Sequence, residues 1–198
     1  MIKVIIFDGI NCISHQEPLS VGLARDYNIP LEKTLPFFKG ALQDCVAGQA
    51  DLKEVLPPYL DAWGWDKGVD ALLDYWFGRD HKIDQQLVSY INNLRKKGIV
   101  CVLGTNNEKY RVAYMLDKMG FAELFDKTYS SAQIGHKKPD QIFFSTIFDD
   151  LKNFKKEEIL FLDDKLENVK GAEEFGIHAE LYTTFEDFEK VMKQYLKE

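Results

Sequence analysis

The stretch Val4-Ile5-Ile6-Phe7-Asp8 places a carboxylate directly after four apolar residues, close to the start of the chain. A short apolar run of this kind is typical of a strand that is buried on both faces, as in a parallel sheet. Open α/β sheets carry their reacting groups at the carboxyl ends of their strands. We therefore expect Asp8 to lie at the edge of a sheet where a functional site can form.

Three further polar segments follow similar runs later in the chain. They are Leu103-Gly104-Thr105-Asn106, Gly135-His136-Lys137-Lys138-Pro139-Asp140 and Leu160-Phe161-Leu162-Asp163-Asp164. The strand ends of a parallel sheet lie along one edge, so these groups can converge although they are far apart in sequence. An acid, a hydroxyl, a lysine and an acidic pair are together sufficient to form one site.

Strand and helix patterns alternate regularly after residue 82. Apolar runs predict strands at 3–7, 99–104, 127–131, 158–162 and 178–182. Helical patterns lie between them, at 84–97, 107–119, from Pro139 onward, at 166–175 and from residue 184. Alternation of this kind predicts an α/β fold, with a parallel sheet core that helices cover on both faces.

The segment 16–82 has helical periodicity and many aromatic residues instead. It is divided into four short helices by breakers, which are Pro30, Pro57-Pro58, Gly64 and Gly68. We predict that 16–82 is a small four-helix domain inserted into a core domain made of 1–15 and 83–198. The inner face of these helices, rather than a substrate pocket, is expected to hold the three tryptophans, Trp63, Trp65 and Trp76.

The bulk composition is that of an ordinary globular protein, with 198 residues, 45% hydrophobic and 29% charged. The net charge of −7 argues against a nucleic-acid partner, because a basic face generally binds the phosphate backbone. The three cysteines fit neither a disulfide framework nor a zinc site. Since neither a signal peptide nor a membrane-spanning run is evident, we expect a cytoplasmic location and no membrane partner. No sequence feature indicates an oligomeric state.

The side chains at the first two strand ends suit chemistry on a phosphoryl group. Asp8 is a candidate nucleophile, because a carboxylate can attack phosphorus or an activated carbon and form a covalent intermediate. Thr105 and Asn106 supply a hydroxyl and an amide near the start of a helix, where backbone N–H groups can help to hold a phosphate. The alternative for all three residues is an ordinary role in a turn or a helix N-cap.

The later two segments provide positive charge and metal ligands. Lys138 precedes Pro139, which favours an extended backbone and directs the ammonium towards the strand ends, so we prefer it to Lys137. Asp163 and Asp164 are adjacent acids that repel one another unless a cation lies between them. Magnesium prefers such oxygen ligands. The alternative for the acidic pair is a turn followed by a helix cap at Asp164.

Together these segments resemble the four motifs of the haloacid dehalogenase superfamily. The most specific match is Phe161-Leu162-Asp163-Asp164-Lys165-Leu166-Glu167-Asn168-Val169-Lys170-Gly171-Ala172, followed by Gly176. The resemblance covers almost the whole chain outside 16–82. It implies a Rossmann-like core with a helical cap inserted after the first motif. It also implies a magnesium-dependent phosphatase that acts on a small phosphorylated metabolite.

The resemblance also assigns roles to individual residues. It makes Asp8 the nucleophile, Thr105 a phosphate ligand and Lys138 the lysine that balances charge. It implies an Mg²⁺ site with Asp163 in the outer shell and three direct ligands, which are Asp8, the backbone carbonyl of Ile10 and Asp164. The segment 16–82 would close over the substrate and select it.

One position departs from the pattern of the family's phosphatases. They carry a second Asp two residues after the nucleophile, and this chain has Ile10 there. In those phosphatases the second Asp protonates the leaving group and later activates water against the aspartyl-phosphate. Loss of a general acid typically costs about a hundred- to ten-thousand-fold in rate. We therefore expect reduced or atypical phosphatase activity, with His15 as a candidate replacement donor. The alternatives are a dehalogenase-like or phosphonatase-like hydrolase, or a non-catalytic module for ligand binding or interaction.

Overall fold

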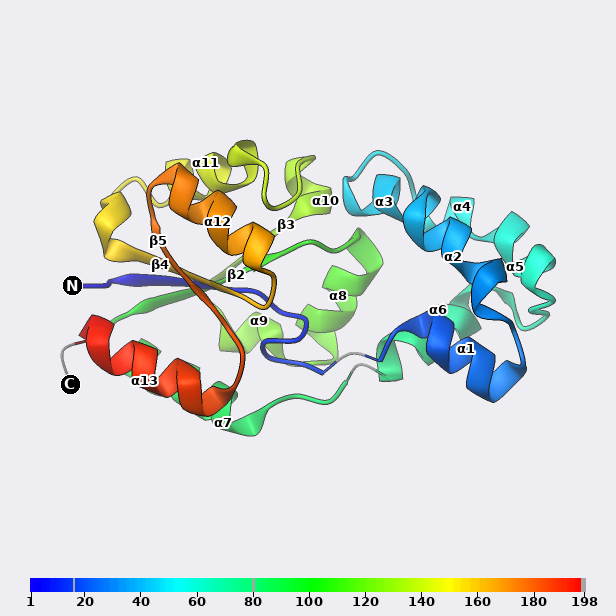
Figure 1. The fold of residues 1–198 in the computed structure, drawn as a ribbon, viewed down its shortest axis with the longest axis horizontal. Coiled ribbons are helices and arrows are strands. Elements are labelled where there is room, and N and C mark those ends of the chain that lie inside the picture. The colour runs from blue at the N-terminus through cyan, green and yellow to red at the C-terminus, as the bar shows by residue number, and fades with distance from the viewer. Residues whose placement is uncertain (16, 80, 197–198) are drawn as a thin grey trace.

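The computed structural model describes residues 1–15, 17–79 and 81–196. Its centre is a five-stranded sheet in the order β3-β2-β1-β4-β5, with every neighbouring pair parallel (Figure 1). The strands are β1 Val4–Phe7, β2 Val100–Thr105, β3 Lys127–Ser130, β4 Ile159–Asp163 and β5 His178–Leu181. The predicted parallel sheet is confirmed, and each strand lies within one residue of its expected bounds.

The register of the central strand explains why the polar segments meet. Phe7 at the end of β1 pairs with Leu103 of β2 on one side and with Leu162 of β4 on the other. Asp8 follows directly, and its backbone N–H donates to the Leu162 carbonyl at 2.9 Å. The next residues of the two neighbouring strands therefore lie level with Asp8 at the same edge of the sheet.

Helices cover both faces of the sheet, as the alternation of strands and helices predicts. Ile5 and Phe7 pack in one cluster with side chains of α7 (Gln85–Lys96), α8 (Lys109–Asp117), α9 (Phe121–Leu124) and α13 (Phe185–Leu196). Val4 and Ile6 point to the other face and pack with α11 (Gln141–Asp150) and α12 (Leu166–Phe175). Period-two alternation along β1 thus buries it on both sides.

Three short elements and one helix start differ from the predicted pattern. Two single-turn helices, α9 and α10 (Ser131–Ile134), and a 3₁₀ turn at Lys156–Glu158 were not expected. The helix predicted to open at Pro139 begins at Gln141 instead. The reason is that the Asp140 carboxylate accepts the backbone N–H of Ile142 at 2.9 Å and acts as the N-cap.

The segment between β1 and α7 contains six short helices within residues 17–79, where four were predicted. They are α1 Leu19–Tyr27, α2 Leu31–Lys39, α3 Ala41–Val46, α4 Leu52–Val55, α5 Pro57–Trp63 and α6 Gly68–Arg79. The extra boundaries lie at Gly40, which separates α2 from α3, and at Asp51, which caps α4. Gln16, the first residue of the predicted insertion, lies outside the described residues.

These six helices bury an apolar cluster of their own, which includes all three tryptophans. They lie beyond the end of the sheet where the polar segments meet (Figure 1). Contacts join this end of the molecule to the sheet: Ser131 donates its hydroxyl to the Val46 carbonyl at 2.7 Å, and Asp51 accepts from Lys109 and Tyr110 of α8. In the described part of the chain, no helix is long and apolar enough to cross a membrane.

Candidate active site

The polar residues predicted from the four segments lie together at the carboxyl edge of the sheet. They line a small cavity of about 100 Å³, whose walls include Asp8, Ile10, Thr105, Asn106, Lys138, Asp163 and Asp164. Asp8 follows β1, Thr105 ends β2 and Asp163 ends β4. The central position of β1 thus places Asp8 between the contributions of the other two strands.

Lys138 is the centre of the cluster. Its ammonium donates to Asp8 Oδ1 and to Asp163 Oδ2, both at 2.6 Å, and to the Gly104 carbonyl at 2.7 Å. Its side chain is only 1% exposed. Burial alone would lower the pKa of Lys138, but the two carboxylates outweigh it and hold the pKa above its ordinary value. The neighbouring Lys137 points elsewhere and donates to Gln43 Oε1 of α3 at 3.0 Å.

Asn106 fixes the backbone of Lys138. Its Nδ2 donates to the Lys138 carbonyl and its Oδ1 accepts the Lys138 backbone N–H, both at 2.9 Å. This pair of bonds orients the amide, and it leaves the second hydrogen of Nδ2 and the backbone N–H of Asn106 as possible donors to a phosphate. Thr105 is fully buried, and its hydroxyl oxygen accepts from Asn107 Nδ2 at 2.6 Å, which leaves the hydroxyl hydrogen to donate.

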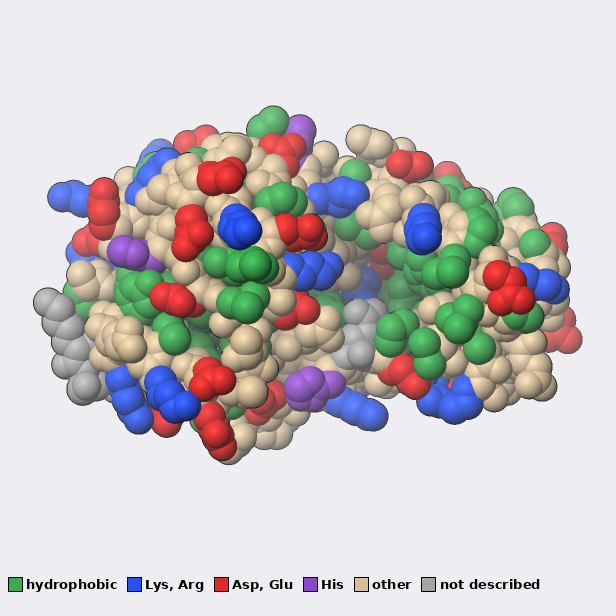
Figure 2. All heavy atoms as spheres, viewed as in Figure 1, with side chains coloured by type: hydrophobic (Ala, Val, Ile, Leu, Met, Phe, Trp, Pro, Cys, Tyr) green, Lys and Arg blue, Asp and Glu red, His purple; other side chains and the backbone are tan. Residues whose placement is uncertain are grey.

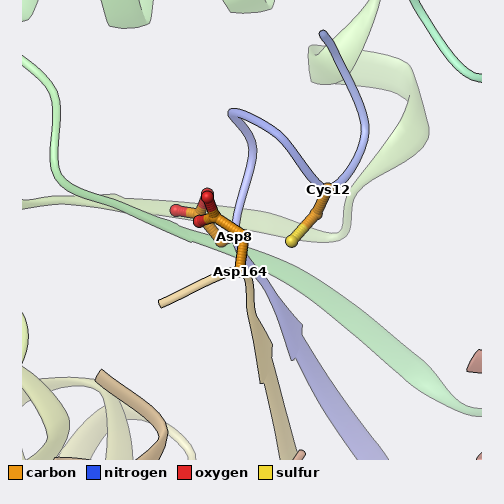
Figure 3. A group of neighbouring side chains, drawn as sticks. All are labelled: Asp8, Cys12 and Asp164. Carbon is orange, nitrogen blue, oxygen red and sulfur yellow. The ribbon is translucent and has the colours of Figure 1, made fainter. Parts of the chain in front are cut away.

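Asp8 and Asp164 point into the same space. One carboxylate oxygen of each lies within 4.8 Å of the other and of Cys12 Sγ, which comes from the loop after β1 (Figure 3). Burial, together with Asp163 and Asp164, raises the pKa of Asp8 to about 6, although Lys138 opposes the rise. Two carboxylates in this arrangement repel one another, and a cation between them would remove the repulsion.

The donors around this space suit a hard divalent cation such as Mg²⁺. Asn168 also lines the cavity, and its amide oxygen is buried and has no hydrogen-bond partner among the described residues, while its Nδ2 donates to Asp163. Cys12 is a soft ligand that Mg²⁺ does not prefer. Burial raises the pKa of its thiol well above the ordinary value, so Cys12 is a neutral neighbour rather than an anionic ligand.

Asp163 is occupied by protein donors. Its Oδ2 accepts from Lys138, and its Oδ1 accepts from the backbone N–H of Lys165 and from Asn168 Nδ2, both at 2.9 Å. These bonds orient Asp163 towards Lys138 rather than towards the space between Asp8 and Asp164. Its arrangement is compatible with an outer-shell position, as expected from the sequence, and that role stays a prediction.

The loop after Asp8 shows what the unusual residues do. Ile10 lines the cavity with an aliphatic side chain that has no proton to transfer. Asn11 has φ of 66°, a left-handed conformation that Gly and Asn adopt most readily, and its Nδ2 donates to Asp164 Oδ2 at 3.1 Å. His15 is exposed and lines a separate cavity with Glu17, Arg25 and Arg79, so it does not support the replacement-donor hypothesis.

Three amides of this site were not selected from the sequence: Asn11, Asn107 and Asn168. Each directly follows or lies within a few positions of a residue that was selected. A polar amide next to a functional acid or hydroxyl is therefore a usable signal. Their partners, however, come from different strand ends, so only the fold reveals what each one binds.

A larger cavity of about 430 Å³ adjoins the first and shares Asn106, Asn107, Lys138 and Lys165 with it. Its opposite wall comes from the helical insertion, with Leu42, Gln43 and Val46 from α3 and Trp76 and Phe77 from α6. Figure 2 shows a hollow between the two parts of the molecule, with Lys and Arg side chains at its margin. The insertion thus forms a wall over the site.

Comparisons with known proteins identify related sequences and folds. Residues 69–181, more than half of the chain, match the haloacid dehalogenase-like hydrolase family. The chain is 27% identical over 188 residues to a D-ribitol-5-phosphate phosphatase of Bacteroides thetaiotaomicron, covering 89% of each protein.

Two further similarities concern only part of a relative or only the fold. The chain is 30% identical over 104 residues to drimenol cyclase of Aspergillus calidoustus, which is 51% of this chain and about a fifth (20%) of that protein. Its fold resembles that of a haloacid dehalogenase family enzyme of B. thetaiotaomicron, solved in complex with magnesium and inorganic phosphate. The TM-score is 0.80 at 20% identity, with 96% of this chain and 99% of that chain covered.

Proposed function

This chain belongs to the haloacid dehalogenase-like hydrolase family, and on that premise we propose that it is a magnesium-dependent phosphatase acting on a small phosphorylated metabolite. The observation that carries the proposal is the Lys138 ammonium, 2.6 Å from both Asp8 and Asp163 in a cavity that Thr105 and Asp164 also line. A buried cation held beside a carboxylate nucleophile suits the transfer of an anionic phosphoryl group.

The reaction proceeds in two displacements at phosphorus. A carboxylate oxygen of Asp8 attacks phosphorus, the bond to the leaving oxygen breaks, and that oxygen departs with the electron pair. Water then attacks the aspartyl-phosphate and releases a proton to solvent, the bond between phosphorus and Asp8 breaks, and phosphate leaves with the Asp8 carboxylate restored. Lys138 balances the charge of Asp8 and the phosphoryl oxygens, while the Thr105 hydroxyl and the Asn106 backbone N–H donate to the phosphoryl group.

We assign the metal ligands on the same basis. Asp8, the backbone carbonyl of Ile10 and Asp164 would hold Mg²⁺, with Asp163 in the outer shell. Bound there, the ion supplies charge neutralisation at the phosphoryl oxygens. The relation between Asp8 and Asp164 supports this assignment, since their oxygens lie within 4.8 Å of each other and burial already raises the pKa of Asp8 to about 6.

Ile10 limits the first displacement. An alkoxide leaving group must take its proton from solvent, because Ile10, which lines the cavity, has no proton to give. Phosphate esters with weakly basic leaving groups are therefore the better substrates. Esters of ordinary alcohols react more slowly, by about a hundred- to ten-thousand-fold relative to an enzyme with the acid in place.

We further propose that 16–82 is a cap domain on a core formed by 1–15 and 83–198, and that it closes over the substrate. Its helices have an apolar cluster separate from the two clusters on the sheet. Side chains of α3 and α6 form the outer wall of the 430 Å³ cavity. The cavity wall formed by these helices can contact the leaving group and select it, while the residues at the sheet edge bind the phosphoryl group.

The test is a magnesium-dependent assay on phosphate esters whose leaving groups differ in pKa, with Asp8→Asn as the matched control. We expect turnover to fall steeply as the leaving group becomes more basic, and Asp8→Asn to be inactive on every ester. A flat dependence would contradict the unassisted departure of the leaving group. Turnover equal to that of Asp8→Asn throughout would contradict the phosphatase itself.

A binding measurement complements the assay, because it does not depend on turnover. Magnesium with beryllium fluoride mimics the phosphorylated aspartate, and should raise the melting temperature of the wild type but not of Asp8→Asn. An equal effect on both proteins would exclude Asp8 as the residue that carries the phosphoryl group.

A further inference from the structure

Gly48, in the loop that follows α3, brings the backbone of the insertion against that of the core. It has φ of 71°, and a Cβ atom placed on it would overlap the Ala132 carbonyl oxygen and lie 3.0 Å from the Ala132 carbonyl carbon. Ala132 belongs to α10 of the core. Among the described glycines of the insertion, Gly48 alone would meet the core backbone with a side chain. Glycine therefore fits this position, and any larger residue requires the two parts to shift.

A hydrogen bond lies beside this backbone contact. The Ser131 hydroxyl donates to the Val46 carbonyl at 2.7 Å, and Ser131 is fully buried. Ser131 directly follows β3, next to the end of β2 that supplies Thr105 to the site. The two interactions together form the latch contact, which consists of Val46, Gly48, Ser131 and Ala132.

The latch contact lies away from the covalent connections between the insertion and the core. These two connections run side by side and form one joint, because the His15 backbone N–H donates to the Lys82 carbonyl at 3.0 Å. Phe77 packs against Tyr114 of α8 close to this joint, near the end of α6. In Figure 1 the connections pass along the lower side, whereas α3 and α10 meet at the top. A single joint permits rotation of the insertion, so a contact on the far side decides whether it stays against the core.

Two further polar contacts between the insertion and the core depend on exposed side chains. Lys137 donates to Gln43 at 3.0 Å, and Lys109, whose side chain is 61% exposed, pairs with Asp51. Exposed pairs between long side chains contribute little to stability. The latch contact is buried and involves backbone atoms, so it constrains the position of α3 more tightly than these two pairs.

The latch contact also lies between two cavities. Val46 and Gln43 of α3 line the 430 Å³ cavity that adjoins the Asp8 site. Cys45 and Gly48 line a separate cavity of about 570 Å³. A movement that breaks the latch contact would therefore displace the α3 wall of the 430 Å³ cavity, where the leaving group of a phosphate ester would lie.

We propose that Gly48 and Ser131 are positioning residues: the latch contact holds α3 against the core while substrate is bound, and it opens when substrate enters and product leaves. The inference rests on the proposed function for the reaction that reports it. Opening separates Gly48 from Ala132 and breaks the hydrogen bond of Ser131, while the joint stays in place. A variant that weakens the latch contact lowers the closed fraction of the protein, so part of the binding free energy of the substrate is then used to close it.

The test is Gly48→Ala, with Gly64→Ala as the matched control. Gly64 lies in the same insertion and has φ of 77°, so alanine is strained there as well, but nothing lies within 4 Å of its Cβ position. We expect Gly48→Ala to raise KM for p-nitrophenyl phosphate about three- to tenfold and to change kcat by no more than about twofold. Gly64→Ala should keep both constants. An equal rise of KM in the two variants would overturn the inference, because strain alone would explain it.

Ser131→Ala tests the latch contact without added bulk. It removes the hydroxyl that reaches Val46, and it should raise KM in the same direction but by less than Gly48→Ala. The control is Ser145→Ala, because the Ser145 hydroxyl donates to the Ile142 carbonyl within its own helix. A KM of Ser131→Ala equal to that of Ser145→Ala would contradict the role of the hydrogen bond, and this comparison holds even if Gly48→Ala does not fold.

Labelling of Cys45 measures the latch contact without turnover. Cys45 is 1% exposed and lines the 570 Å³ cavity beside Gly48, whereas Cys101 is buried within β2. With N-ethylmaleimide and peptide mass spectrometry, Cys45 should be labelled about tenfold faster in Gly48→Ala than in the wild type or Gly64→Ala, with the rate at Cys101 unchanged.

The labelling experiment separates this inference from the phosphatase proposal. Faster labelling of Cys45 in Gly48→Ala, without hydrolysis of any ester by the wild type, would retain the latch contact and overturn the phosphatase. Hydrolysis by the wild type, with equal labelling of Cys45 in all three proteins, would retain the phosphatase and overturn the latch contact.

Discussion

The sheet edge and the cavity wall above it handle polar groups in opposite ways. At the sheet edge, Lys138 donates to Asp8, Asp163 and Gly104, and Asn106 holds the backbone of Lys138 on both sides. At the wall, the Trp76 N–H has no partner in the described residues. The difference is that the groups at the sheet edge are held by one another, whereas the wall keeps a buried donor that no described residue satisfies.

The largest effect is expected from restoring an acid at the sheet edge. Ile10→Asp should raise turnover of alkyl phosphates by about a hundred- to ten-thousand-fold, because the leaving alkoxide then has a proton donor beside the cavity. Turnover of p-nitrophenyl phosphate should rise much less, since its leaving group needs no proton and only the attack of water on the aspartyl-phosphate gains a base. Ile10→Asn is the control, because it is polar but has no proton to give. Equal gains on both esters would contradict the assigned defect.

Removing the Lys138 ammonium should disrupt the cluster of polar groups at the sheet edge. Lys138→Met leaves two buried carboxylates without their partner, and should lower the free energy of unfolding by roughly 3–5 kcal/mol at neutral pH. It should also reduce turnover by about a hundredfold or more. Denaturant unfolding measures the first effect, with Lys137→Met as the control, which should be nearly as stable as the wild type. A loss of similar size in Lys137→Met would disprove the special position of Lys138.

The raised pKa of Asp8 predicts how stability depends on pH without metal. Because the folded pKa is about 6 and the ordinary value is 3.8, the folded state binds more protons between these values than the unfolded state. The metal-free wild type should therefore lose stability relative to Asp8→Asn as pH rises from 4 to about 6, and no more above that. Saturating Mg²⁺ should reverse the loss. Melting temperatures across pH test this, and a difference independent of pH would refute it.

The smallest effect is expected where the insertion meets α8. Asp51 binds Lys109 and Tyr110 there, and the hydrogen bond from Lys109 outweighs the opposing effect of burial and holds the pKa of Asp51 below its ordinary value. Asp51→Asn retains the cap of α4 but removes the charge, and should lower the melting temperature by at most about 4 °C. The difference should vanish at low pH, where Asp51 is protonated in both states. A larger shift would mean that this contact holds the two parts together.

The sequence was sufficient to predict the sheet and the groups at its edge. Apolar runs that end in a polar residue define both a buried strand and the point where it reaches the surface, so Asp8, Thr105 and Asp163 could be placed without coordinates. Pro139 made it possible to prefer Lys138 over Lys137, and the two lysines do differ in the expected way.

Features set by single caps or by tertiary partners could not be predicted in the same way. The helical insertion has six helices rather than four. A local hydrogen bond such as the Asp51 cap can begin a new helix where the sequence has no Pro or Gly to mark the boundary. Trp63, Trp65 and Trp76 look alike in a periodic pattern, and only the folded chain shows which indole finds a carbonyl. Asn168 and Asn107 are equally dependent on partners from other strands.

The central place of β1 in the sheet has a consequence for how the chain folds. Val4 is synthesised well before its sheet partners, which are Val100 and Ile159. The apolar cluster of the insertion, by contrast, draws all its buried members from between Leu19 and Phe77, so its contacts are local and can form during synthesis. The strand β1 must therefore remain unpaired until β2 has been synthesised, and its apolar residues are open to aggregation in that interval.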